Sequence, residues 1–205
     1  ILRHGKTPLK SSNLSFDNFS IQLLNLIDEL NFNRIHLVGF SIGSLIARNF
    51  AEKYNERLES LTLLCSIFKR NEEQQQIVND RFELSKKSRS LSKQALKRWF
   101  TDKYIHKNPK IYEEISSMLN ENNMEDFLKV YELFVKHKDN EKFEKIKVKT
   151  LIMTGELDSG STPEMSKNLG KYIKNSIIKI IKNGKHLCSI ECADEVNHAI
   201  KLHVN

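Results

Sequence analysis

The fold is decided by residues 35–54, IHLVGFSIGSLIARNFAEKY. Residues 35–38 are short and apolar, which favours a buried strand, and residues 44–54 have the apolar spacing of a helix. Between them, residues 39–43 (GFSIG) fit the pattern G-x-S-x-G, in which two glycines keep side chains away from a serine on a strained turn. The stretch therefore predicts a strand, a tight turn that presents Ser41, and a helix behind it.

The rest of the chain alternates between strand and helix patterns. Helices are predicted at residues 15–30, 163–172 and 189–204, and further strands at residues 58–65, 148–154 and 176–181. The segment from 69 to 145 is charged, has a helical pattern and shows no strand signal. Alternating strands and helices favour an α/β fold with a mostly parallel sheet. We expect a core in two parts, residues 1–68 and 146–205, with a helical cap at 69–145 inserted before the strand at 148–154.

A serine hydroxyl becomes a nucleophile when a base takes its proton and an acid orients that base. Asp158 follows the strand predicted at 148–154, and open α/β sheets place functional residues at such strand ends. Glu156 is the competing carboxylate on the same loop. Asp158 is preferred because it lies further out along the loop.

His186 is the preferred base among seven histidines. It follows the strand at 176–181 and the turn Asn183-Gly184, so a loop there can bring its imidazole over the sheet edge. The six others lie in predicted strands or helices or near the start of the chain: His4, His36, His106, His137, His198 and His203. The sequence therefore predicts Ser41, Asp158 and His186 as catalytic residues. The backbone N–H of Ile42, at the start of the next helix, is the predicted oxyanion donor.

The net charge, the apolar runs and the cysteine content limit the functions and locations that the sequence allows. The net charge of +7 could attract nucleic acid, but no nucleic-acid motif accompanies it, and scattered lysines favour a solvated surface. No apolar run reaches the roughly 20 residues of a membrane helix. Cys65, Cys188 and Cys192 form no disulfide framework, and no metal site is predicted from them. A signal-peptide pattern is not seen, so the cytoplasm is the expected compartment.

With these residues in view, the chain resembles the α/β-hydrolase superfamily over its whole length and, more narrowly, the 3-oxoadipate enol-lactonases. The likeness lies in the elbow at 37–43 and in residues 4–7 (HGKT), 97–101 (KRWFT), 155–165 (GELDSGSTPEM) and 185–187 (KHL) with Glu191. It implies a serine hydrolase that opens a carboxylic ester or lactone through an acyl-enzyme without a cofactor. It also implies that Trp99 lines the pocket and that Arg98 meets a substrate carboxylate; packing inside the cap for Trp99 and a surface ion pair for Arg98 are the alternatives.

The resemblance has departures. Ser44 stands where many relatives have a further glycine, and Cys188 replaces a residue that is often small or proline. Relatives also have several strands before the loop that residues 4–7 resemble, and these include the loop with the second oxyanion donor. We therefore expect that donor to lie outside this chain.

Other functions stay open on the same fold. A general carboxylesterase, a carbon–carbon bond hydrolase and a perhydrolase would all keep the triad, whereas a ligand-binding homologue would use it only for recognition. The expected partner is a small-molecule substrate, with neither nucleic acid nor membrane involved, and the sequence does not decide the oligomeric state.

Overall fold

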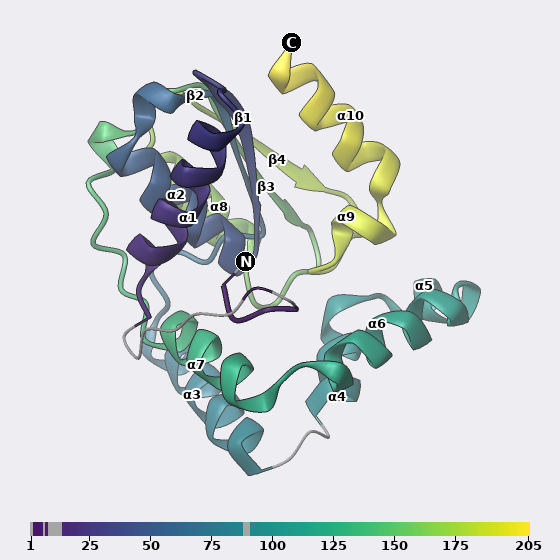
Figure 1. Ribbon diagram of the computed structural model, residues 1–205. Coiled ribbons are helices and arrows are strands. Elements are labelled where there is room, and N and C mark those ends of the chain that lie inside the picture. The colour runs from purple at the N-terminus through teal and green to yellow at the C-terminus, as the bar shows by residue number, and fades with distance from the viewer. Residues whose placement is uncertain (1, 6, 8–13, 88–90) are drawn as a thin grey trace. The chain divides into compact units, whose positions relative to one another are not determined.

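The computed structural model describes residues 2–5, 7, 14–87 and 91–205, with only the backbone of 91–93 (Figure 1). The chain forms two compact units. One contains residues 16–69 and 139–205 and holds the sheet. The other contains residues 70–138 together with the described part of the first 15 residues.

The sheet unit confirms the predicted α/β class. Its four strands are parallel in the order β1-β2-β3-β4, with Val38 opposite Thr62 and Ile152 opposite Ile178. These strands are β1 (Ile35–Phe40), β2 (Leu58–Leu64), β3 (Thr150–Gly155) and β4 (Ser176–Ile181). Because all four run the same way, their carboxyl ends meet at one edge of the sheet, where a site is expected.

Helices cover both faces of this sheet (Figure 1). One face carries α1 (Phe16–Glu29), α2 (Ile42–Lys53) and α8 (Pro163–Gly170), and the other carries α9 (Cys188–Glu191) and α10 (Ala193–Val204). Two 3-10 turns lie in the connections, at Asn55–Arg57 and Phe143–Lys145. The core between the sheet and α10 is apolar and buried: Leu64, Cys65, Leu151, Met153, Ile181, Cys188 and Val196.

The part of the helical unit that the structure describes contains five helices: α3 (Glu72–Lys87), α4 (Leu91–Trp99), α5 (Asp102–Lys107), α6 (Pro109–Glu121) and α7 (Met124–Val135). Helices α3 and α7 pack through buried Val78, Phe82 and Val135. Within the loop at residues 4–7, His4 and Thr7 form an antiparallel bridge, and Lys6 lies outside the described residues. This loop groups with the helices rather than with the sheet. The division at 68 and 145 stays a prediction.

Two local expectations differ from the structure. Strand β1 was expected to be buried, yet Val38 is 46% exposed, because in the described sheet β1 pairs with β2 alone and lies at an edge. The final helix was expected to be continuous from 189 to 204. It is divided into α9 and α10 at Cys192, whose φ of −123° and ψ of 41° are not helical.

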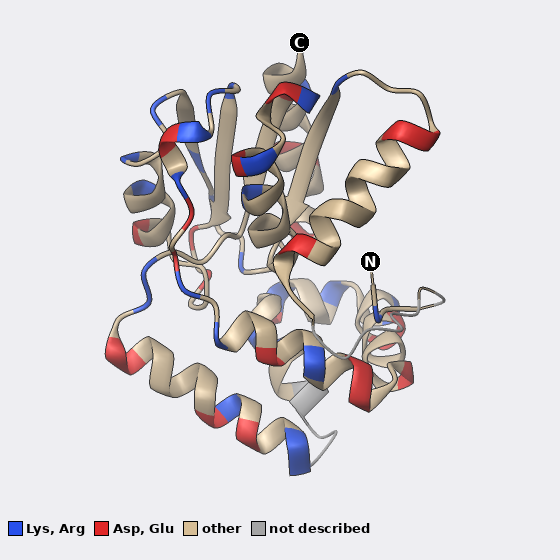
Figure 2. Cartoon of the chain, turned by 60° about the vertical axis from the view of Figure 1, so that its left-hand side comes forward, with Lys and Arg blue, Asp and Glu red and all other residues tan. Residues whose placement is uncertain are grey.

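Charged residues of both signs alternate along the helices and loops (Figure 2). Several form pairs one helical turn apart, such as Lys129 with Glu125 and Lys136 with Glu132. Such exposed pairs contribute little stability and are typical of a solvated surface. No helix in the part of the chain that the structure describes is long and apolar enough to cross a membrane.

Candidate active site

Ser41 occupies the turn between β1 and α2 in a strained backbone conformation. Its φ is 52° and its ψ is −120°, a region that residues with a side chain rarely adopt. The turn is held by the Ser41 N–H, which donates to the carbonyl of Leu64 at 2.9 Å, and by the Ser44 hydroxyl, which donates to the Ser41 carbonyl at 2.5 Å. The turn therefore presents the serine at the carboxyl end of the sheet.

The two glycines of the turn have different steric roles. A Cβ on Gly39 would lie 2.4 Å from the carbonyl oxygen of Gly43 and 2.7 Å from the Cβ of Ala47, so a side chain there would collide with helix α2. A Cβ on Gly43 would meet no described atom within 4 Å. The G-x-S-x-G pattern predicts that both glycines avoid a clash, and the described surroundings require this only of Gly39.

Asp158 lies in the loop after β3, and its side chain is almost fully buried. Its Oδ1 accepts hydrogen bonds from the backbone N–H groups of Gly160 and Ser161, at 2.8 and 3.0 Å. Burial raises the pKa of Asp158, but the hydrogen bond and charge of His186 and the two backbone donors outweigh it, so the pKa is held below its usual value. The carboxylate is therefore ionised at neutral pH.

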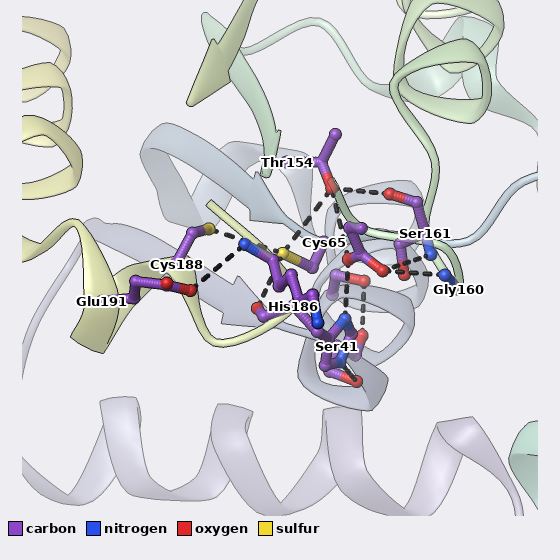
Figure 3. A network of polar contacts seen from close by, with 11 residues as sticks. Ser41, Cys65, Thr154, Gly160, Ser161, His186, Cys188 and Glu191 are labelled. Carbon is purple, nitrogen blue, oxygen red and sulfur yellow. Dashed lines mark hydrogen bonds and ion pairs between the residues drawn. The ribbon is translucent and has the colours of Figure 1, made fainter. Parts of the chain in front are cut away.

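His186 lies between Asp158 and Ser41. Figure 3 shows it close to Ser41. Its Nδ1 is 2.7 Å from Oδ2 of Asp158, and its Nε2 is 3.0 Å from Oγ of Ser41. A proton on Nδ1, facing the carboxylate, leaves the lone pair of Nε2 to accept the serine O–H. The ring of Phe40 packs beside the imidazole, with the ring centres 5.2 Å apart. This arrangement can take a proton from the serine hydroxyl.

Gly155, the last residue of β3, allows the loops of Asp158 and His186 to approach each other. A Cβ there would lie 2.3 Å from the carbonyl oxygen of Gly184 and 2.4 Å from that of Lys185. The Leu157 N–H also donates to the Gly184 carbonyl, at 2.8 Å. No sequence pattern indicates this role, because it depends on a contact between two separate loops.

Glu156, the competing carboxylate, makes a different contact. Its Oε2 accepts the backbone N–H of Asn183 at 2.9 Å, so it supports the turn before His186 rather than the imidazole itself.

Ile42 is the first residue of α2, and the N–H groups of a helix's first turn have no acceptor within the helix. These N–H groups carry partial positive charge, which suits an oxyanion.

Two of the other histidines, His36 and His203, make structural contacts. His36 contacts the hydroxyl of Ser60 at 2.8 Å, and His203 is buried with its Nε2 3.1 Å from the carbonyl of Leu61. Burial lowers the pKa of His203, which favours its neutral form. Neither side chain contacts the Ser41–His186–Asp158 group through a described hydrogen bond.

Arg98 and Trp99 are the last two residues of α4, in the helical unit, and both are half-buried. Burial lowers the pKa of Arg98, and the nearby charge of Arg81 lowers it further. Because Ser41 belongs to the other compact unit, the substrate-binding role of Arg98 and Trp99 stays a prediction.

Cys65 is a further neighbour of the site, and no sequence pattern predicts it there. It directly follows β2, and its thiol, an oxygen of Asp158 and a ring nitrogen of His186 lie within 4.8 Å of one another. Such a set could hold a metal ion. The close contacts of His186 with Asp158 and Ser41 already give both side chains a role without one.

Residues 3–192 match the model of the family described as the alpha/beta hydrolase fold, so the chain belongs to that family. Among relatives, it is similar to (E)-2-((N-methylformamido)methylene)succinate hydrolase of Acinetobacter baylyi, with 24% identity over 97% of this chain and 75% of the relative. It is also similar to 3-oxoadipate enol-lactonase 2 of the same organism, with 21% identity over 97% of this chain and 74% of the relative.

Solved structures support the same fold. An enol-lactonase from Burkholderia xenovorans LB400 superposes with a TM-score of 0.87 at 20% identity, covering 98% of this chain and 77% of that protein. The esterase EaEST from Exiguobacterium antarcticum gives a TM-score of 0.89 at 16% identity, covering 98% and 78% respectively. At such identities the likeness is one of fold alone.

Proposed function

We propose that this protein is a serine hydrolase that cleaves a small carboxylic ester or lactone through an acyl-enzyme. The observation that carries the proposal is the hydrogen-bonded series from Ser41 through His186 to Asp158, with distances of 3.0 and 2.7 Å. Membership of the alpha/beta hydrolase family and similarity to named hydrolases support the same reaction class.

In this mechanism, His186 takes the proton from Oγ of Ser41 as the oxygen attacks the carbonyl carbon of the substrate. Asp158 holds the proton on Nδ1 and stabilises the imidazolium that forms. The backbone N–H of Ile42 donates to the developing oxyanion. His186 then protonates the leaving alcohol or enol oxygen, and in the second half of the cycle it takes a proton from water, which releases the acid.

For the substrate, we propose 3-oxoadipate enol-lactone as the first compound to test, because enol-lactonases stand among both the relatives and the solved structures. In this proposal Trp99 lines the acyl pocket and Arg98 meets a substrate carboxylate. The similarity to the succinate hydrolase makes (E)-2-((N-methylformamido)methylene)succinate the second compound to test.

The experiment measures hydrolysis of both compounds and of a simple aryl acetate by the protein and by Ser41→Ala. Ser117→Ala is the matched control, because Ser117 lies exposed on α6, where it bonds to Glu121. Loss of the triad serine should cost on the order of 10⁴-fold or more in rate, with the circular dichroism spectrum unchanged.

Near wild-type activity in Ser41→Ala would show that the nucleophile is wrongly assigned. Aryl ester cleavage that depends on Ser41, without turnover of the enol-lactone, would keep the serine hydrolase and discard the lactonase.

A further inference from the structure

Two thiols beside the candidate site are not used by the proposed reaction. Cys65 follows β2 in a left-handed conformation, with a φ of 54°, and Cys188 begins α9, two residues after His186. Both are free cysteines, and they are 1% and 0% exposed. Their sulfur atoms are 3.8 Å apart, in the network drawn in Figure 3.

We propose that Cys65 and Cys188 form a redox modification site, in which a small peroxide oxidant joins them in a disulfide that displaces His186. The disulfide itself does not depend on the proposed function. Its effect on activity rests on that function.

The chemistry is balanced by one molecule of hydrogen peroxide. One thiol, as its thiolate, attacks a peroxide oxygen, so that an S–O bond forms, the O–O bond breaks and water leaves. The second thiol then attacks the sulfenic sulfur, so that an S–S bond forms and the S–O bond breaks with loss of a second water. Two thiols are oxidised and the peroxide is reduced to two waters.

Contacts connect Cys65 and Cys188 to His186, the proposed base. The Cys65 thiol donates to the backbone carbonyl of His186 at 3.2 Å, and the disulfide removes this donor. The sulfurs must also approach from 3.8 Å to a bond of about 2.05 Å. Because Cys188 is two residues from His186, this movement pulls on the loop that sets the 3.0 Å contact to Ser41. A misplacement of about 1 Å can cost on the order of 100-fold in rate.

Because both thiols are buried, the formation and the reduction of the disulfide are both slow. The hydrogen-bond contact with Cys188 and desolvation by burial raise the pKa of the Cys65 thiol well above its usual value, so little thiolate is present. Once formed, the disulfide is equally shielded from external thiols. The modification therefore responds to prolonged oxidant rather than to brief exposure.

The test treats the native protein with hydrogen peroxide, alkylates the remaining thiols in denaturant, and maps the peptides by mass. We expect one of the three cysteines to stay alkylatable, a mass lower by two hydrogen atoms, and a peptide linking residues 65 and 188. Ester hydrolysis should fall by on the order of 100-fold and return with dithiothreitol.

Replacement of each cysteine in turn shows which thiols form the disulfide. Cys65→Ser, which keeps a donor toward His186, should retain activity under oxidant. Cys188→Ala removes the other thiol of the pair and should also retain activity under oxidant. Cys192→Ser is the matched control and should behave as the wild type. Its thiol is only partly buried, and burial with the charge of Glu191 raises the pKa of Cys192 to about 11.

Three outcomes would overturn the proposal: all thiols free after prolonged oxidation, a link from Cys188 to Cys192, or full activity with the mapped disulfide in place. If no ester is hydrolysed even before oxidation, the proposed function fails, and the thiol count and peptide map still decide whether the disulfide forms.

Discussion

Replacement of Arg48 tests the largest fully buried side chain in the sheet unit. Arg48 lies in α2 and is 0% exposed. Its Nη2 is 2.6 Å from a carboxylate oxygen of Asp139 and 2.7 Å from one of Glu141, and its Nη1 donates to the carbonyl of Ile67 at 2.8 Å. The guanidinium also lies 5.0 Å from the ring centre of Phe143. A single side chain thus contacts the chain just before and just after the segment 70–138.

Arg48→Met keeps much of the side-chain volume but removes the positive charge between two carboxylates whose side chains are only 11% and 5% exposed. Removing one partner of a buried ion pair costs about 3–5 kcal/mol in free energy of unfolding. For a chain of this size, that loss lowers the melting temperature by about 6–20 °C.

Thermal unfolding followed by circular dichroism measures this change. Arg34→Met is the control, because the Arg34–Glu59 pair has a similar N–O distance of 2.7 Å but side chains that are 51% and 44% exposed. It should cost less than about 1 kcal/mol. Adding Asp139→Asn and Glu141→Gln to Arg48→Met should recover part of the loss. Equal melting temperatures for Arg48→Met and Arg34→Met would refute the reasoning.

Three further predictions concern the candidate site. Asp158→Asn should lower kcat by on the order of 10⁴-fold while Glu156→Gln stays within about tenfold, and the reverse ranking in steady-state kinetics would move the acid to Glu156. Gly39→Ala should unfold at markedly lower urea concentration than the wild type, because its Cβ would lie 2.4 Å from a backbone oxygen, whereas Gly43→Ala should match the wild type. Phe40→Leu should lower kcat/KM by about 2- to 5-fold, because an aromatic ring close to a forming imidazolium contributes about 0.5–1 kcal/mol. An unchanged kcat/KM would show that Phe40 has no such role.

The parts of the fold that could be predicted from the sequence are those set by local pattern. Apolar runs bounded by turn residues located the four strands, and the strand at 176–181 has the predicted bounds. Ser41, Asp158 and His186 could be proposed together for one reason. Each follows a strand, and parallel strands bring their carboxyl ends to one edge.

What the sequence could not predict depends on contacts between distant parts of the chain. The pairing of Cys65 with Cys188 joins residues 123 apart, and that of Arg48 with Asp139 joins residues 91 apart. No spacing in the sequence marks either pair. The same is true of Gly155, which looks like an ordinary turn residue until the loop of Gly184 and Lys185 is placed against it.

The hydrogen bond between Ser41 and His186 has a consequence for the order of events during synthesis. The two residues are 145 positions apart, so at about 5–20 residues per second the proposed base leaves the ribosome about 7–30 s after the proposed nucleophile. Throughout that interval the elbow of β1 and α2 can form locally, but Ser41 has no imidazole beside it. Under the proposed mechanism the nascent chain is not acylated at Ser41 before β3 and β4 have joined the sheet.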